Sequence, residues 1–531
     1  MDSSLSRTDE KTEAHERAER QSQQNDEPLE TPSGIRLYLI FVALIFAAFL
    51  VSLNASIVST ATPSITNEFN AISDIGWYGS AYLLATCSLQ PLMGKFYAHF
   101  PAKNVIMTAI SIFELGSLLC GVATSSNFFI VGRAVAGTGS SGILSGALNI
   151  MVASVSLEKR PLVNGINFAI SATGNVIGPL IGGALTQHVS WRWCFYINLP
   201  FGGLTLLLLF LVNVSDARSE TNRNLDLVTT LRRIDFAGCA MFVPATMMFL
   251  LAFEWAGSDY GWDSPTIIGL LCGSVVTICI FGFWQHRMGE NAMIPLSLLS
   301  KREVLFSCCT AFLQMGTLLL FSYFLPLWFQ VVKGASPTMS GVMNLPIMLS
   351  QSLLLVLSVS KIGYYIPFAV VGGSLTAIGA GLLSTLTPTS SAGKWIGYQI
   401  FVGVGRGMVL QVPLTAVQAV VHRDQLPLGS ALIMFCAYFG SALFVSLGET
   451  VFINRLLPAL HQYLPHVPPE SIIRAGATNA RSAVPASDLP GLILAYNQAI
   501  TQTWYLSAGG STLAALTSLG MGWRNIKDKN E

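Results

Sequence analysis

The sequence predicts an all-α, polytopic membrane protein with about fourteen transmembrane helices. Hydrophobic residues make up 52% of its 531 residues, and charged residues make up only 11%. A soluble chain carries roughly 25% charged residues. Apolar runs that are long enough to cross a bilayer as helices recur along almost the whole chain. The net charge of +1 gives no reason to expect a nucleic-acid partner.

The chain starts with a polar segment, residues 1–35, that is rich in Glu, Gln, Ser and Arg. This composition predicts a disordered tail, and without a short apolar core before a cleavage site it does not resemble a signal peptide. Length and hydropathy then place the spans. Their approximate ranges are 37–59, 77–97, 104–123, 128–150, 162–185, 192–213, 235–256, 266–286, 304–328, 339–360, 365–386, 395–418, 428–452 and 498–522.

Lysine and arginine are spread unevenly over the loops between these spans. An even number of spans places both termini on one side of the membrane. If the N-terminus is inside, the short outer loops hold only Arg192, Lys333 and Lys394, and the inner loops are strongly basic. Cytoplasmic loops carry such an excess, so both termini are predicted to be cytoplasmic.

The residues that usually carry catalysis or bind metal form no known pattern. All nine cysteines fall in or beside apolar runs, and none has metal-ligand spacing. The sequence contains no phosphate-binding Gly-x-x-x-x-Gly-Lys-Ser/Thr loop and no Gly-x-Ser-x-Gly elbow. We therefore expect no cofactor, no metal and no catalytic residue, and any pumping must draw on an ion gradient.

A weak internal repeat relates the first six spans to the last six. Residues 131–133 read Val-Gly-Arg in span four, and residues 404–406 read the same in span twelve. Each is followed by a basic inner loop and a glycine-dotted span, in which Gly440 corresponds to Gly174. Transporters are often built from such repeats, with the substrate near the midplane between them. The predicted parts are a cytoplasmic tail (1–35), an N-terminal six-helix bundle (36–213), a linker with two inserted helices (214–303), a C-terminal six-helix bundle (304–522) with an outer loop (453–497), and a second cytoplasmic tail (523–531).

Span five contains a glycine-rich stretch. Gly174, Gly178 and Gly182 are four residues apart, so they share a helix face and let another helix approach closely. Pro179 removes a backbone donor and is expected to bend the helix, and Gly183 ends the stretch. The pattern leaves two interpretations: a packing motif of any membrane protein, or a bendable helix at a moving interface between the two halves.

Three ionisable residues lie in the middle of predicted spans: Glu114, Arg133 and Arg406. Each costs roughly 2.5–3.5 kcal/mol at a helix centre, so each requires a role or a partner. We consider Glu114 and Arg133 together as candidates for proton coupling. A carboxylate beside a cation loads a proton on one side of the membrane and releases it on the other when its surroundings change. The alternative is a static ion pair or a polar packing contact.

Polar and aromatic side chains within the spans predict the lining of a cavity. The predicted lining consists of Asn54, Gln314, Tyr323, Arg406 and Gln411. An apolar, aromatic cavity with few charges suits a bulky, poorly soluble organic molecule better than a sugar phosphate or a metal ion. The alternative is that the aromatic side chains of span nine face lipid.

Three motifs resemble those of the major facilitator superfamily, in particular its fourteen-span drug:proton antiporters and the fungal toxin and multidrug efflux pumps among them. The motifs are residues 174–183 in span five, Arg133 with Gly137 and Gly139 in span four, and Gly94, Lys95 and Lys103 in the loop between spans two and three. The resemblance implies that these are the antiporter motif of exporters, the arginine linked to proton transfer, and a gating loop. Residues 191–202 are similar to a signature of the fungal group.

Two positions depart from the family pattern, because Asn54 and Ala98 stand where an acid is usual. The first departure shifts the expected proton-carrying role to Glu114. The second weakens the salt-bridge latch that the resemblance implies on the inner side. Arg406 is also unexpected in span twelve, where its positive charge would favour an anionic or hydrogen-bond-accepting substrate.

The resemblance implies a major facilitator fold that works by alternating access. The implied function is proton-coupled efflux of a small hydrophobic organic molecule, such as a fungal secondary metabolite, a mycotoxin or a drug, by a monomer in the lipid bilayer. The expected location is the plasma membrane, with the vacuole as the alternative. Two other functions stay open: proton-coupled uptake of a nutrient or an iron chelate, and a non-transporting receptor or scaffold.

Overall fold

The computed structural model describes residues 34–523 except for short gaps at 72–73, 156–158, 213, 215–225, 257–259, 363, 470–471, 473–479 and 483. The two predicted tails lie almost wholly outside these residues. Within the described residues, regular structure is helical apart from an isolated bridge between Ala256 and Tyr260. The all-α prediction is therefore confirmed.

Every predicted span coincides with helix. The span helices are α2 (Ile35–Phe69), α3 (Ile75–Ser88) with α4 (Gln90–His99), α5 (Ala102–Gly121), α6 (Ser126–Ala153), α7 (Arg160–His188), α8 (Trp193–Tyr196) with α9 (Asn198–Leu211), α12 (Phe236–Trp255), α13 (Pro265–Met288), α15 (Arg302–Val331), α16 (Pro337–Met343) with α17 (Leu345–Ile362), α18 (Ile366–Leu383), α19 (Ala392–Val409) with α20 (Val412–Val420), α21 (Leu426–Tyr463) and α23 (Leu489–Ser518). Among the described residues, eleven helices are long and apolar enough to cross a membrane.

Spans two, six, ten and twelve differ from the prediction, because each is divided into two helices. A proline lies in the first turn of the helix that follows each break: Pro91 in α4, Pro200 in α9, Pro346 in α17 and Pro413 in α20. Proline has no N–H and is tolerated in the first turn of a helix, so these breaks satisfy its geometry. Short helices α11 (Leu227–Arg232) and α14 (Leu296–Leu299) lie between spans.

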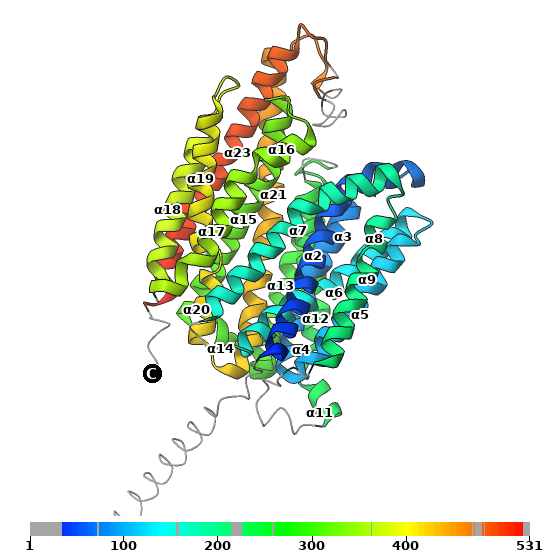
Figure 1. The fold of residues 1–531 in the computed structure, drawn as a ribbon, viewed down its shortest axis with the longest axis vertical. Helices are drawn as coiled ribbons and strands as arrows, with labels where there is room; N and C mark the ends of the chain where they lie inside the picture. Colours follow the sequence, from blue (N-terminus) through cyan, green and yellow to red (C-terminus); the bar gives the residue numbers. More distant parts are fainter. Residues whose placement is uncertain are drawn as a thin grey trace, which may run out of the picture.

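The two halves of the chain repeat the same helix contacts. In the first half α2 packs against α7, and in the second α15 packs against α21. A Cβ on Gly174 of α7 would lie 3.0 Å from the carbonyl oxygen of Phe49 in α2. A Cβ on the corresponding Gly440 of α21 would collide with the carbonyl of Phe312 in α15. Figure 1 shows the two halves side by side.

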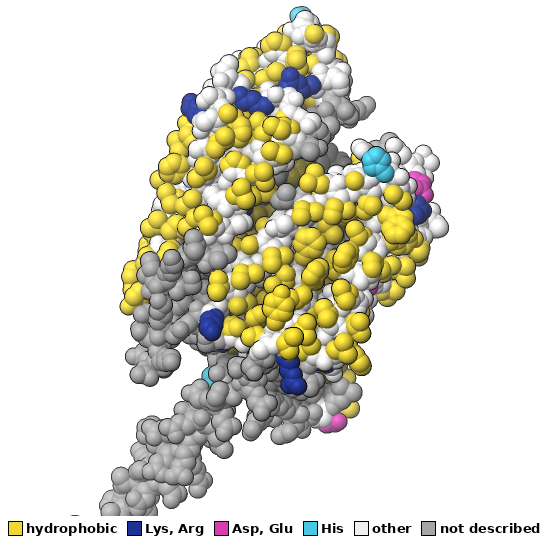
Figure 2. Space-filling model, viewed as in Figure 1, with side chains coloured by type: hydrophobic (Ala, Val, Ile, Leu, Met, Phe, Trp, Pro, Cys, Tyr) yellow, Lys and Arg dark blue, Asp and Glu magenta, His cyan; other side chains and the backbone are white. Residues whose placement is uncertain are grey.

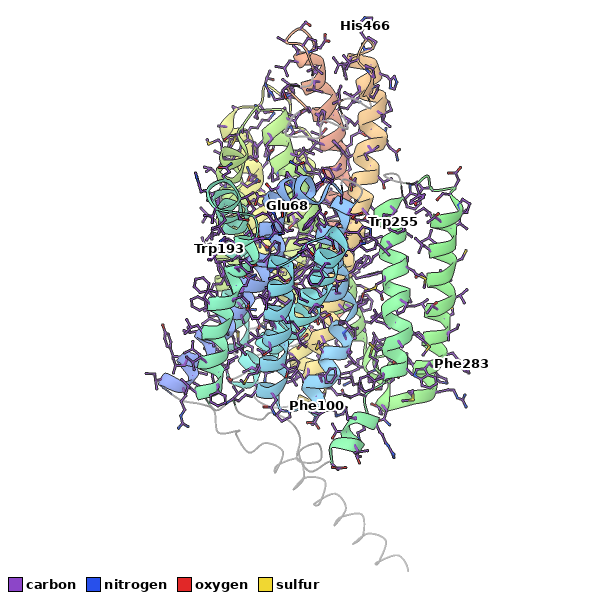
Figure 3. The ribbon with its side chains drawn as sticks, turned by 90° about the vertical axis from the view of Figure 1, so that its right-hand side faces the viewer. Glu68, Phe100, Trp193, Trp255, Phe283 and His466 are labelled. Carbon is purple, nitrogen blue, oxygen red and sulfur yellow. The ribbon has the colours of Figure 1, made fainter. Side chains whose placement is uncertain are left out.

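The inserted helices α12 and α13 form a pair of their own. They pack against each other, and the Ser274 hydroxyl of α13 donates to the carbonyl oxygen of Ala245 in α12 at 2.8 Å. Figure 3 shows this pair on one flank of the bundle, with Trp255 on α12 and Phe283 on α13. Helix α12 also contacts α3 and α21, so the pair touches both halves.

The start of α2 and the last described residues lie at the same end of the bundle, which we call the terminus end (Figure 1). The main contacts between the two halves join α4 to α21 and α7 to α17. Figure 1 shows the helices of the two halves diverging toward the opposite end, the far end.

Hydrophobic side chains cover the flank of both halves that Figure 2 shows, and lysine and arginine gather toward the two ends. Apolar flanks with charged ends are the pattern expected of helices surrounded by lipid. The protein is a multi-pass membrane protein.

Candidate functional site

The glycine motif of span five packs α7 against α2 of its own half. A Cβ on Gly182 would lie 2.9 Å from the carbonyl oxygen of Ile57, and one on Gly178 would collide with the Ser56 hydroxyl. A Cβ on Gly183 would meet nothing within 4 Å. The spaced glycines therefore allow close helix approach, as their spacing predicts. Their partner is α2 rather than the other half of the chain, so the expectation that this face lies between the two halves is corrected.

The interface between the halves uses the first two turns of α7 instead. The Asn164 amide donates to the side-chain oxygen of Gln418 at 3.3 Å, and Arg160 donates to the main-chain oxygen of Gln418 at 3.3 Å. A Cβ on Gly165 would lie 2.9 Å from the carbonyl oxygen of Leu355 in α17. These contacts hold the two halves together at the terminus end.

The three residues of the predicted gating loop have three different partners. A Cβ on Gly94 would lie 2.7 Å from the Ala431 methyl of α21, so Gly94 sits at the contact between the halves. The Lys95 ammonium, 2% exposed, donates to the main-chain oxygen of Glu290 at 3.2 Å. Lys103 donates to two carbonyl oxygens at the end of α9, at 2.9 and 2.8 Å. A cation is favourable at a helix C-terminus, so Lys103 caps α9.

Arg133 is held by groups from two other helices. Its side chain is 1% exposed. Its Nε donates to the carbonyl oxygen of Tyr78 at 2.8 Å, and its Nη1 donates to the side-chain oxygen of Asn54. The guanidinium also lies 4.5 Å from the ring centroid of Tyr82, within cation–π range. Asn54 therefore acts as an acceptor for Arg133.

A buried polar chain continues from Asn54 across the first half. The Asn54 amide donates to the Ser117 hydroxyl of α5 at 3.5 Å, and the Asn198 amide of α9 donates to the same oxygen at 3.2 Å. Ser117 lies one helical turn from Glu114. The chain thus links Arg133 on α6 to the neighbourhood of Glu114 on α5.

Glu114 itself lies between α5 and α9. Its side chain is 9% exposed, and neither carboxylate oxygen accepts a hydrogen bond from any described residue. It packs against Gly202 of α9, where a Cβ would collide with the carboxylate. The alternative of a static ion pair between Glu114 and Arg133 is not met among the described residues, because Asn54 and Tyr78 hold the guanidinium.

The second half holds the other predicted polar residues. Arg406 on α19 is 5% exposed and lies 5.8 Å from the ring centroid of Phe321 on α15. Gln314, two turns from Phe321 on the same helix, is 3% exposed, and its Nε2 has no acceptor among the described residues. Gln411 donates to the carbonyl oxygen of Leu355 at 2.9 Å, close to the contact with α7.

Tyr323 does not lie with these residues. Its side chain is 54% exposed, whereas Phe321 is 1% exposed. The Tyr323 ring packs edge-on against Phe324 at 5.2 Å between centroids. Phe321 therefore lies inside the second half, whereas Tyr323 is exposed on the side of α15 near Glu449 of α21 and Glu254 of α12.

Sequence reasoning missed several residues of these contacts. Ser117 and Asn198 are uncharged polar residues in apolar spans, and their signal was their position in the stretches around Glu114 and 191–202. It also missed a ladder of stacked rings between α12 and α21, in which Phe439 lies 5.4 Å from Phe435 and 5.3 Å from Phe249. Phe435 and Phe439 are four residues apart, a spacing that places them on one helix face.

Solved structures of low sequence identity share this fold. The proton:xylose symporter XylE aligns with a TM-score of 0.58 at 14% identity, over 92% of this chain and 97% of its own. The human organic anion transporter MFSD10 aligns with a TM-score of 0.55 at 14% identity, over 92% of this chain and 100% of its own. At this level of identity the similarity concerns the fold alone.

Curated fungal proteins are much more similar in sequence. The MFS-type transporter pigP of Monascus ruber is 46% identical over 93% of this chain and 87% of its own length. The efflux pump mlcE of Penicillium citrinum is 43% identical over 98% of this chain and 97% of its own length. The efflux pump mokI of Monascus pilosus is 43% identical over 92% of both chains. Residues 44–445 match the family model described as Major Facilitator Superfamily, and the chain belongs to that family.

Proposed function

We propose that this protein exports a small hydrophobic organic molecule, such as a fungal secondary metabolite, a mycotoxin or a drug, in exchange for protons. The observation that carries the proposal is the similarity over nearly the full chain to mlcE and mokI, both named efflux pumps, at 43% identity. Major facilitator proteins are transporters, so this protein is a transporter and not an enzyme.

The two bundles, residues 36–213 and 304–522, alternate between opening to one side of the membrane and to the other. We place both termini in the cytoplasm of a monomer in the plasma membrane, because the inner loops are basic. The contacts of Gly94 and Asn164 then close the cytoplasmic side, and the described conformation faces outward. Cargo leaves to the outside from this conformation.

Glu114 is the proton-carrying residue of this proposal, and Arg133 stands at the other end of its polar chain. Supporting this role, no described residue donates a hydrogen bond to the buried Glu114 carboxylate, and an ionised carboxylate there is costly. When Glu114 gains or loses its charge, its need for hydrogen-bond donors changes. Ser117 and Asn198 lie next to it and can respond to that change. Asn54 joins these groups to Arg133, so the charge state of Glu114 affects the packing of α2, α5, α6 and α9.

The test is transport into proteoliposomes that hold purified protein and an imposed pH gradient. A panel of hydrophobic drugs should move against their gradient only when the proton gradient is present. Glu114→Gln should abolish or uncouple this movement, while Asp263→Asn, which changes an exposed carboxylate, should leave it unchanged. Wild-type transport that ignores the pH gradient rules out proton exchange, and cargo movement only in the uptake direction rules out export.

A further inference from the structure

The two halves place an arginine at matching positions, but of these two only Arg133 is seen to donate hydrogen bonds among the described residues. Arg133 donates to Tyr78 and Asn54. Arg406, at the same place in the repeated Val-Gly-Arg run, is 5% exposed. In the described part of the chain its buried Nε has no acceptor, and its guanidinium lies 5.8 Å from the ring centroid of Phe321.

The neighbours of Arg406 on α19 show which way it faces. A Cβ on Gly405 would collide with α18, and a Cβ on Gly407 would lie 2.8 Å from the Leu354 side chain of α17. Phe401 and Ile400, on the remaining side, are 46% and 42% exposed. Arg406 therefore projects into the interior of the second half, toward α15, and cannot reach water by lying along the helix surface.

A buried guanidinium without an acceptor is costly. It carries five N–H donors and a charge that does not neutralise, and replacing an unpaired buried charge usually stabilises a protein. In membrane spans such residues mark substrate or ion pathways. The first half satisfies its arginine internally, so the unsatisfied donors of Arg406 are available for a group that is not part of the chain.

A second unsatisfied donor lies on the helix that Arg406 faces. Gln314 and Phe321 are seven residues apart on α15, hence on one face and roughly 10 Å apart along the axis. The Gln314 Nε2 is buried without an acceptor. The interior of the second half thus combines a cation, an amide donor and a flat aromatic ring, and these suit a planar molecule that bears oxygen acceptors.

We propose that Arg406 binds an anionic oxygen group of the cargo, a carboxylate or an enolate, while Phe321 contacts the cargo's ring system and Gln314 donates a second hydrogen bond. The proposal rests on the export function above and names its substrate class as acidic aromatic molecules. Arg406 and Phe321 are buried in this outward-facing conformation, so the cargo contacts them in the inward-facing conformation and has left them before release to the outside. Closure around the bound cargo removes the ion pair from water and strengthens it.

The test is binding to purified, full-length protein in lipid nanodiscs, with empty nanodiscs as the background. The probes are a panel of aromatic carboxylates, including 1-pyrenebutyrate, each paired with its neutral primary amide. Wild-type protein should bind at least one carboxylate about ten- to a hundred-fold more tightly than its amide. Arg406→Gln should remove that preference and Arg406→Lys should keep part of it. Arg287→Gln, at an exposed arginine, should change nothing.

Thermal unfolding of the same variants separates a binding role from a structural one. Removal of an unpaired buried charge should raise the unfolding temperature of Arg406→Gln in the absence of cargo. A lower unfolding temperature indicates an internal partner and overturns the proposal. So does a panel in which no carboxylate binds in preference to its amide.

Transport by the same preparations distinguishes this proposal from the export function. Equal export of amides and acids by both wild-type protein and Arg406→Gln would support the export function and overturn the anion site. Binding of the acids through Arg406, without any transport of them in proteoliposomes, would support the anion site and overturn the export function.

Discussion

The ammonium group of Lys95 donates to the main-chain oxygen of Glu290 at 3.2 Å, which joins the gating loop of the first half to the end of the inserted helix pair. A buried apolar cluster surrounds this contact. It combines Leu92 of α4, Phe242 of α12 and Leu432 of α21. The inserted pair is therefore part of the contacts that close the terminus end. From Ala98, which stands where the family usually has an acid, we had expected a weaker salt bridge there.

Substitution of Lys95 tests this closure. Lys95→Met keeps the apolar stem but removes a charged hydrogen bond, which is typically worth about 1.5–3 kcal/mol. We expect amide hydrogen exchange to rise by about tenfold or more in residues 426–432, at the start of α21. Lys103→Met, which affects only the cap of α9, should leave that segment unchanged. Equal exchange in wild type and Lys95→Met would mean that the contact does not support the closure.

Asn54 supplies an acceptor to Arg133, so its replacement by an apolar residue should be costly. Asn54→Leu leaves a buried charge with one acceptor fewer, and a hydrogen bond to a charged group is typically worth about 1.5–3 kcal/mol. Asn54→Asp keeps an acceptor and should be tolerated better. The measurement is the fraction of folded protein after purification, together with its unfolding temperature. A stable Asn54→Leu protein would show that the contact is dispensable.

Two adjacent glycines in span five provide a matched pair of variants. Gly182→Ala places a methyl 2.9 Å from the carbonyl oxygen of Ile57, and such overpacking costs about 1–3 kcal/mol. Gly183→Ala meets nothing within 4 Å, and alanine favours a helix by about 1 kcal/mol over glycine. We expect the unfolding temperature to fall for the first variant and to hold or rise for the second. The opposite order would contradict the packing of α7 on α2.

Asp235 organises the terminus end of the inserted pair. It caps α12 by accepting from the Gly238 amide at 2.7 Å, and it accepts from Trp284 and Gln285 of α13 at 2.8 and 2.7 Å. Asp235→Ala leaves several buried donors unsatisfied, each costing about 1–3 kcal/mol. We expect faster proteolysis at the terminus end of α12 and α13, whereas Asp263→Ala at an exposed position should have no effect. Identical cleavage rates for the two variants would rule out this role.

The terminus end should also lose stability in acid because of His99, which lies beyond the predicted second span. Burial, with the positive charges of Lys95 and Arg233, lowers the pKa of His99 from 6.5 to about 4. Between these values the unfolded chain binds a proton that the folded protein does not, so stability falls as pH falls from 6.5 toward 4. His99→Gln should flatten this part of the curve of unfolding temperature against pH. A wild-type curve with the same slope as the variant would contradict the shifted pKa.

The fold class could be predicted from the sequence because it depends on local properties. Span length and hydropathy place each helix by its own residues, and bilayer thickness sets the same requirement for all of them. The spacing of Gly174, Gly178 and Gly182 likewise predicted a face of close approach. What the spacing does not contain is the identity of the opposing helix, and the structure places α2 there.

The polar contacts were decided by the tertiary structure. Glu114 and Arg133 are both ionisable residues in mid-span, and the sequence alone paired them. The rotation of α5 turns Glu114 toward Gly202 of α9, while α6 turns Arg133 toward Asn54. Side-chain partners depend on the rotation and position of whole helices relative to one another, and local sequence does not specify either quantity.

The internal repeat likewise separates what the sequence predicts from what helix packing decides. From the sequence, Arg133 and Arg406 are equivalent, because each ends a Val-Gly-Arg run in a glycine-rich span. In the structure, Asn54 and Tyr78 complete the first site, and the buried Nε of Arg406 has no acceptor among the described residues. Sequence by itself determined the all-α class and the order and approximate positions of the spans, since these follow from burial in lipid. Only the packing of helices far apart in the chain decided which arginine is satisfied, because acceptors reach a buried guanidinium from other helices and not from its own.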